Sequence, residues 1–273
     1  MKSQERRTIR KSRLLTAAVL LPVLFGVIWE LPPFPFFLFT ALVIARVQYE
    51  FYLLFFPPDR MKPLVFGVWL GLSLTTALYL RLPFLGVALV FLLMLILLYT
   101  LSTFKDIKTT MTESSVLFFG VIYISGLLSH FILLRHLPEG RRFLVLLFLM
   151  IWGGDAGAYY VGRNFGKRKL SPSVSPNKTI EGAVGGLLTT LLACIVAKLT
   201  FLPLLTWRDV LILSPLLGIF GQLGDLIESM LKRSAGVKDS SGIIPAHGGL
   251  FDKLDSIAFA LPLLYYYLTF IKH

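Results

Sequence analysis

Six acidic side chains interrupt the apolar segments of the second half of the chain: Asp155, Glu181, Asp225, Glu228, Asp252 and Asp255. Charged groups inside membrane helices are costly and usually face a partner or a cavity. Asp225 and Glu228 are three residues apart, so they share one helix face, and Asp252 and Asp255 repeat this spacing. Two such faces could hold Mg²⁺, which binds one or two carboxylates together with substrate phosphates. The same acids could instead pair with Lys or Arg.

The segment between these two acidic faces combines cations with glycines. Lys232, Arg233 and Lys238 can meet phosphate oxygens. Gly248 and Gly249 let the backbone approach a ligand, and they precede the last apolar segment, whose first N–H groups would favour an anion. Cations alone are also common in cytoplasmic loops of membrane proteins. Beside the carboxylates, they favour metal-dependent phosphoryl or nucleotidyl transfer.

A second basic loop, 163–178, lies upstream of these residues and includes Lys167. Its prolines predict extended backbone ahead of a helix, and Thr179 or a neighbour can cap that helix. Lys178 and Glu181 would then lie at the mouth of the helix. We expect this loop to contribute to the same site.

Two isolated side chains carry weaker signals. His247 could hydrogen-bond its own loop, donate to a phosphate or act as a general acid, and the sequence leaves these roles open. The single cysteine, Cys194, lies in an apolar run, where we expect it either to face lipid or to pack. One cysteine excludes a disulfide framework and a cysteine-rich metal site.

The elements that must position these residues are long and apolar. Hydrophobic residues make up 56% of the 273, with a mean hydropathy of +0.76, against about 45–50% in soluble domains. A membrane helix needs roughly 20 apolar residues. The sequence therefore predicts an all-α polytopic integral membrane protein with about nine transmembrane helices. The predicted segments are 14–31, 34–56, 64–80, 83–102, 114–134, 142–162, 179–200, 209–229 and 251–271.

The second segment is the least regular, because Arg46 and Glu50 interrupt it. They are four residues apart, so they could pair on one helix face. The choice between eight and nine spans depends on this segment.

Lys and Arg are concentrated in alternate loops. The bias predicts a cytoplasmic N-terminus and an outer C-terminus, and it places loops 163–178 and 230–250 in the cytoplasm. We interpret the net charge of +12 in this way and expect no nucleic-acid partner. Residues 1–150 would be scaffold helices and residues 151–273 the catalytic part.

At these motifs the chain resembles the phosphatidate cytidylyltransferases, also called CDP-diglyceride synthases. The upstream stretch from Asp155 through Glu181-Gly182 is also similar, whereas the first half resembles the family only in hydropathy. The family usually has Arg where this chain has Lys253, and Lys lacks the bidentate fork of Arg. The C-terminal matches, in order and spacing, are Ser229, Lys232, Arg233, Lys238, Asp239, Pro245, His247, Gly248, Gly249, Asp252 and Asp255.

The resemblance implies transfer of CMP from CTP or dCTP to phosphatidate, giving CDP-diacylglycerol and pyrophosphate for phospholipid synthesis. It also implies Mg²⁺, a second cation such as K⁺, a homodimer, and a multi-pass protein of the cell membrane whose site faces the cytoplasm. A phosphatidate oxygen would attack the α-phosphorus of CTP in line, so no side-chain nucleophile is needed.

The roles predicted on this basis divide into three groups. Asp225 and Asp252 are the first-choice metal ligands, followed by Asp255 and Glu228; Asp155 and Glu181 would support the basic loop or a second cation. Asp225, Asp252, Asp255, Lys232 and His247 form the predicted catalytic set. The predicted substrate-binding set is Lys178, Lys167, Arg233, Lys238, Asp239, Gly248, Gly249 and Ser229.

Three alternatives compete with this prediction. A transporter would also carry intramembrane acids, but these cluster at one membrane face, and no inverted repeat is visible. An enzyme that consumes CDP-diacylglycerol would resemble a different Asp-rich motif, which is absent from the sequence. A non-catalytic relative stays open, because one sequence does not show which positions are constrained.

Overall fold

The computed structural model describes residues 22–57, 59–83, 85–104, 106–241 and 248–272, and these are almost entirely helical. Eight helices in this part are long and apolar enough to cross a membrane. Of the first predicted segment, 14–31, residues 14–21 lie outside the described residues, and the described part is helical over 22–30. The predicted all-α membrane class is therefore confirmed.

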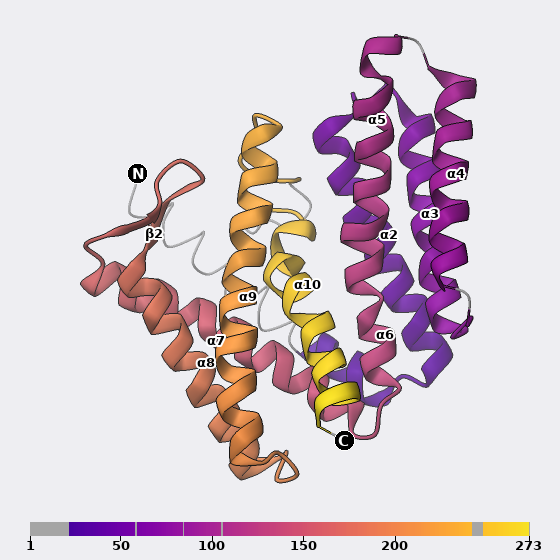
Figure 1. Ribbon diagram of the computed structural model, residues 1–273. Helices are drawn as coiled ribbons and strands as arrows, with labels where there is room; N and C mark the ends of the chain where they lie inside the picture. The colour runs from indigo at the N-terminus through magenta and orange to yellow at the C-terminus, as the bar shows by residue number, and fades with distance from the viewer. Residues whose placement is uncertain (1–21, 58, 84, 105, 242–247, 273) are drawn as a thin grey trace.

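The first half forms a group of helices on one side of the molecule (Figure 1). The segment with Arg46 and Glu50 is one continuous helix, and the two side chains pair at 3.0 Å as predicted. The last crossing of this group runs as α5, a π-helical turn and α6. The bounds are α2 Pro33–Phe55, α3 Met61–Tyr79, α4 Leu85–Thr103, α5 Ile107–Gly120, η1 Val121–Gly126 and α6 His130–Arg135.

The second half contains three long helices, a hairpin and a final helix that lies between α9 and the first group (Figure 1). Helix α7 packs along α8, and α9 packs against α8 and α10. The bounds are α7 Gly140–Phe165, β1 Lys169–Ser171, β2 Ser175–Thr179, α8 Ile180–Thr200, α9 Trp207–Ser234, α10 Phe251–Tyr266 and η2 Tyr267–Ile271.

Two local features differ from the predicted boundaries. Helix α9 continues to Ser234, beyond the predicted end at residue 229, so Lys232 and Arg233 are helical. The ion pair of Lys232 with Glu228, one turn earlier, favours this extension. The loop 163–178, expected to be extended, contains an antiparallel hairpin, β1–β2. As predicted, Thr179 caps α8, since its Oγ accepts a hydrogen bond from the Gly182 N–H.

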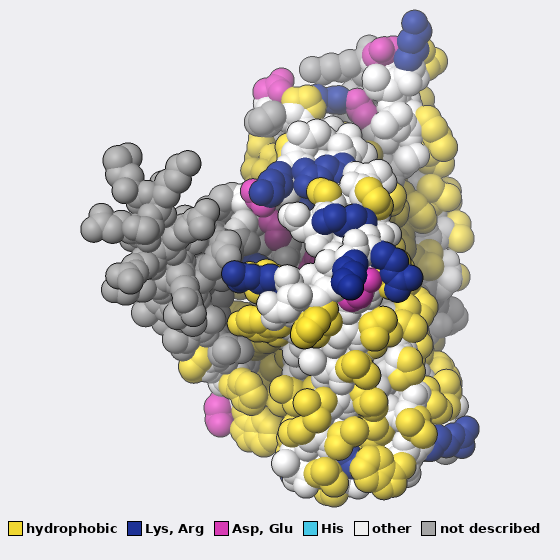
Figure 2. Space-filling model, turned by 90° about the vertical axis from the view of Figure 1, so that its left-hand side faces the viewer, with side chains coloured by type: hydrophobic (Ala, Val, Ile, Leu, Met, Phe, Trp, Pro, Cys, Tyr) yellow, Lys and Arg dark blue, Asp and Glu magenta, His cyan; other side chains and the backbone are white. Residues whose placement is uncertain are grey.

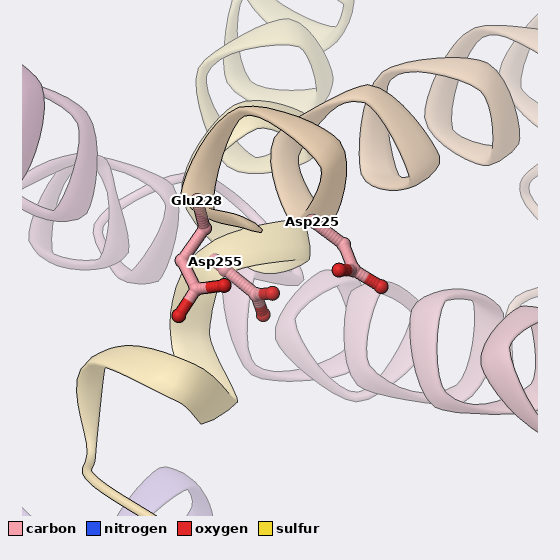
Figure 3. Close-up of side chains that lie close together, drawn as sticks. All are labelled: Asp225, Glu228 and Asp255. Carbon is pink, nitrogen blue, oxygen red and sulfur yellow. The ribbon is translucent and has the colours of Figure 1, made fainter. Parts of the chain in front are cut away.

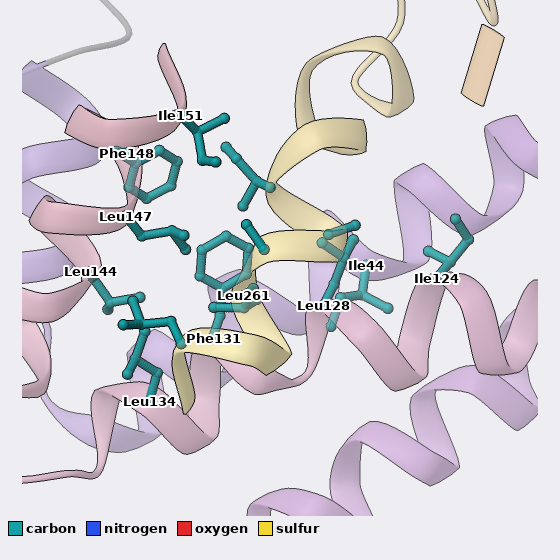
Figure 4. Packing of buried hydrophobic residues seen from close by; sticks show 14 of the residues in the cluster. Ile44, Ile124, Leu128, Phe131, Leu134, Leu144, Leu147, Phe148, Ile151 and Leu261 are labelled. Carbon is teal, nitrogen blue, oxygen red and sulfur yellow. The ribbon is translucent and has the colours of Figure 1, made fainter. Parts of the chain in front are cut away.

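The core joins the two halves along α2, α7 and α10. Ile44, Leu144, Leu147 and Leu261 are fully buried in one continuous cluster, which extends to Ile124 on η1 (Figure 4). Cys194 is also buried, which agrees with the packing alternative for this residue and not with the lipid-facing one. This packing fixes α10 relative to both halves.

Candidate active site

The site begins where α9 and α10 approach closely at Gly224. A Cβ at this position would lie 2.6 Å from the Asp255 carbonyl oxygen and 3.2 Å from Phe259 Cβ. Glycine is therefore needed for the two helices to touch at this point. The close approach places Asp225 and Glu228, which directly follow this contact on α9, beside Asp255 on α10.

Three carboxylates from these two helices converge. Oxygen atoms of Asp225, Glu228 and Asp255 all lie within 4.8 Å of one another, and Figure 3 shows the side chains gathered where α9 and α10 meet. Glu228 is buried, whereas the other two are partly accessible. Within the described residues, Glu228 Oε1 is buried and accepts no hydrogen bond of good geometry, although Lys232 Nζ lies 2.6 Å away. A hard, oxygen-seeking cation matches this donor set.

Two lysines offset part of the negative charge. Lys178 Nζ, at the end of β2, lies 2.7 Å from Asp225 Oδ2. Lys232 Nζ lies 2.6 Å from both Glu228 Oε1 and Asp252 Oδ1. Lysine brings three donors and a positive charge, and it also binds phosphate as a point charge. The same two ammonium groups could therefore meet substrate phosphates.

Asp252 is engaged differently from the three converging acids. Its Oδ2 accepts hydrogen bonds from the Gly249 N–H at 2.7 Å, the Ser240 hydroxyl at 2.9 Å and the Ser240 N–H at 3.2 Å. Its Oδ1 accepts from Lys232. Gly248 adopts a positive φ of 82°, and a Cβ there would meet Asp252 Oδ2 at 2.5 Å. Asp252 thus ties the loop to the start of α10.

A cavity of about 630 Å³ opens beside the carboxylates. Asp225, Glu228 and Asp255 line it together with Asp155 from α7, and the hairpin contributes Lys178. Figure 2 shows Lys and Arg side chains gathered in a band across the upper half of the face that carries the hairpin, above a hydrophobic surface. The cavity therefore combines an acidic floor with cationic surroundings, which suits a metal–polyphosphate ligand.

The hairpin is held by Glu181. Its Oε2 accepts hydrogen bonds from the N–H groups of Lys167 at 3.0 Å and Arg168 at 3.1 Å, and its Oε1 accepts from Arg168 Nε at 3.2 Å. These contacts hold the basic loop, one of the two roles predicted for Glu181, while a role at a second cation stays a prediction. Lys167 therefore contacts Glu181 through its backbone N–H, while its side chain is exposed.

Several predicted substrate-binding residues lie away from this cavity. Arg233, Lys238 and Asp239 are exposed and do not line it. Ser229 does line it, and its hydroxyl lies 3.4 Å from Asp225 Oδ1. His247 lies outside the described residues. The substrate-binding roles of these residues stay predictions.

Several residues that line the cavity are not among the predicted site residues. Tyr159 and Arg163 line the cavity one and two turns after Asp155 on α7, and Gln222 lies one turn before Asp225 on α9. Helical periodicity from the two acids could have identified all three. Asn177 faces the same cavity from the hairpin.

Glu50 is the most distant contributor. It is fully buried on α2, within the predicted scaffold half. Its Oε2 accepts from the Phe251 N–H at 2.8 Å and lies 3.4 Å from the Ser240 hydroxyl, and its Oε1 accepts from the Ser241 hydroxyl at 2.8 Å. The charge of Glu50 within the second apolar segment was the sequence signal that could have identified this residue. The sequence did not indicate that its partners are in the loop before α10.

Comparison with known proteins gives consistent matches. A sequence model described as "Cytidylyltransferase family" matches residues 11–271. A phosphatidate cytidylyltransferase of Bacillus subtilis is 41% identical over 182 residues, covering 66% of each chain. One of Staphylococcus epidermidis is 50% identical over 127 residues, 46% of this chain and 48% of that protein. One of Haemophilus influenzae is 47% identical over 141 residues, 50% of this chain and 49% of that protein.

These alignments span about half to two thirds of the length of the curated relatives. The family match, in contrast, extends over nearly all of the chain and includes every element of the cavity.

Proposed function

The chain belongs to the cytidylyltransferase family, and from this premise we propose that it transfers CMP from CTP to phosphatidate, giving CDP-diacylglycerol and pyrophosphate. One observation carries the proposal: three carboxylates converge beside two lysines in a cavity at the ends of membrane helices. The relatives named phosphatidate cytidylyltransferase support the choice of substrates.

Asp225, Glu228 and Asp255 would hold a divalent cation, for which Mg²⁺ is the candidate. When bound, Mg²⁺ would offset the repulsion between the two substrate phosphates and the charge on the leaving pyrophosphate. Their hard oxygen donors fit this ion, and among the described residues the buried Glu228 Oε1 has the ion pair with Lys232 but no hydrogen bond of good geometry. Asp252, engaged by Lys232, Ser240 and Gly249, would position the loop in this proposal.

The cations would bind and orient the phosphates. Lys178 and Lys232 face the cavity from two sides, and Arg163 adds a third positive group on α7. Holding both anionic substrates here would place a phosphatidate oxygen in line with the α-phosphorus of CTP. A bond then forms between that oxygen and the α-phosphorus, while the bond from the α-phosphorus to the bridging oxygen breaks and pyrophosphate departs.

No side chain needs to remove a proton in this scheme, because the phosphatidate phosphate is already anionic. The catalytic contribution of the protein would therefore be positioning and charge stabilisation. A hydrogen bond from His247 to a substrate phosphate stays a prediction.

We further propose that the cavity opens on the cytoplasmic side of the cell membrane, where soluble CTP can reach it. The concentration of Lys and Arg in the loops around the cavity supports this orientation. A second cation such as K⁺, the use of dCTP and a homodimer stay expectations of the family resemblance.

The test is release of pyrophosphate by the purified protein in detergent. Release that requires phosphatidate, CTP and Mg²⁺ together, and that EDTA abolishes, is the expected result. A folded protein that releases no pyrophosphate with CTP or dCTP would contradict the proposal. Ion-flux measurements in vesicles would then test the transporter alternative.

A further inference from the structure

A second, apolar cavity lies beside the polar one. It has a volume of about 230 Å³ and is formed by the helical residues 22–30, α2, α6, α7 and the start of α10. Among the described residues that line it, only Thr40 and Lys253 are polar. Because its walls are membrane-spanning helices, its natural content is hydrocarbon. We refer to it below as the apolar groove.

The groove and the polar cavity share two helices and one residue. Lys253 lines both. On α7, Asp155 faces the polar cavity, whereas Trp152 and Phe148, one and two turns earlier, face the groove. On α10, Asp255 lines the cavity and the adjacent Leu254 lines the groove. The two spaces therefore adjoin at Lys253, which places a cation between an apolar and a polar cavity.

We propose that the apolar groove holds an acyl chain of the phosphatidate substrate, with Lys253 beside the lipid phosphate at the junction. This inference rests on the proposed function, since it assigns the lipid end of the same reaction. Among the described residues, Lys253 takes part in no ion pair with a carboxylate, so its ammonium group can meet an anionic headgroup.

The arrangement favours phosphatidate over a bulk membrane lipid. A bulk lipid could fill an apolar groove, but the junction adds a positive charge next to the three converging carboxylates. In phosphatidate, the charged phosphomonoester lies at one end of the molecule and the acyl chains extend from the other. This arrangement matches an apolar groove that ends at Lys253. Binding energy from the chain would thus help to place the phosphate near the reacting phosphorus.

Chain-length dependence tests the groove directly. Val43 and Val27 are half-buried lining residues on α2 and on the first helix, and Val43→Trp and Val27→Trp would each fill the space. The measured quantity is the ratio of kcat/KM for dioleoyl to dihexanoyl phosphatidate, at a fixed mole fraction in mixed micelles. We expect both variants to lower this ratio by about tenfold, equivalent to about 1.4 kcal/mol.

A matched control is available one residue away. Leu42 is 71% exposed on the outer face of α2, so Leu42→Trp adds the same bulk outside the groove and should leave the ratio as in the wild type. Turnover of dihexanoyl phosphatidate also reports that each variant is folded. Equal ratios for all three variants would overturn the proposal, because the groove would then hold only bulk lipid.

The variant Lys253→Met distinguishes the contribution of the lipid phosphate to binding from that of the acyl chain. This change should raise KM for both phosphatidates by about tenfold, because it removes the cation and leaves the groove intact. An unchanged KM for both lipids would overturn the assignment of Lys253 to the phosphate.

A binding measurement keeps this inference distinct from the proposed reaction. A phosphatidate with a diazirine in its acyl chain should crosslink to residues of the groove, and excess phosphatidate but not phosphatidylcholine should suppress the crosslinks. This result would support the groove even if no pyrophosphate were released. Crosslinks that both lipids suppress equally, or that persist in Val43→Trp, would overturn it.

Discussion

Glu50 on α2 accepts a hydrogen bond at 2.8 Å from the backbone N–H of Phe251, the first residue of α10, which lies 201 residues later in the chain. The carboxylate is fully buried and also binds the Ser241 hydroxyl of the preceding loop. A buried acceptor for an N–H group at a helix start is worth more than an average hydrogen bond, because it is charged. The first half of the chain therefore fixes where α10 begins.

Replacing this carboxylate should weaken both stability and turnover. Glu50→Gln keeps the shape but loses the charge, so we expect the free energy of unfolding to fall by about 1–3 kcal/mol and kcat to fall by about tenfold. Thermal unfolding in detergent and pyrophosphate release measure the two effects. Glu30→Gln, at an exposed carboxylate on the first helix, is the control, and an equal effect of both changes would contradict the positioning role.

The two acids of α10 should respond differently to neutralisation. Asp255→Asn removes a member of the converging carboxylates, so we expect kcat to fall by about a hundredfold or more and the Mg²⁺ concentration for half-maximal activity to rise. Asp252→Asn should mainly loosen the loop, since it weakens the bonds to Lys232, Ser240 and Gly249. Limited proteolysis and a Mg²⁺ titration distinguish them. A similar shift of the Mg²⁺ requirement in both variants would make Asp252 a ligand, as the sequence predicted.

The helix contact at Gly224 should not tolerate a side chain. Gly224→Ala places a methyl group 2.6 Å from the Asp255 carbonyl oxygen, so α9 and α10 must separate, at a cost of about 1–3 kcal/mol. We expect at least a tenfold loss of activity and a lower unfolding temperature. Gly86→Ala, where no atom lies within 4 Å of the added group, should change neither quantity.

Lys178 should contribute to nucleotide affinity. Its Nζ is 2.7 Å from Asp225 and faces the cavity from the hairpin. Lys178→Met removes a charged hydrogen-bond donor, so we expect KM for CTP to rise by about tenfold or more. Lys169→Met removes an exposed charge of the same hairpin outside the cavity. An unchanged KM for CTP in Lys178→Met would remove this lysine from the phosphate site.

The fold was largely predictable because membrane helices leave a strong signal. The predicted segments 34–56 and 179–200 match α2 and α8 within about one residue at either end. The predicted end of α9 was wrong by more than one turn, because the ion pair of Glu228 with Lys232 extends the helix into polar sequence. The hairpin was missed because its strands are short and polar, and Glu181 holds it from outside.

The candidate site was predictable in composition but not in arrangement. Spacing placed Asp225 with Glu228 on one helix face, but it could not show that Gly224 lets Asp255 complete the cluster. Likewise, Asp252 and Asp255 are three residues apart, as two metal ligands on one helix face could be, so their spacing alone does not separate the two roles. The engagement of Asp252 by Ser240 and Gly249 depends on a loop conformation that periodicity does not describe.

The pair of Arg46 and Glu50 has a consequence for how the chain enters the membrane. Glu50 reaches the bilayer long before Phe251 is synthesised, since 201 residues at about 5–20 residues per second correspond to roughly 10–40 s. Arg46, one turn earlier and 3.0 Å away in the folded protein, is the partner available as soon as α2 is helical. The arginine would then act as a temporary counter-charge during biogenesis, and Arg46→Leu should reduce insertion of α2 in a translocation assay more than it reduces the activity of protein that has already folded.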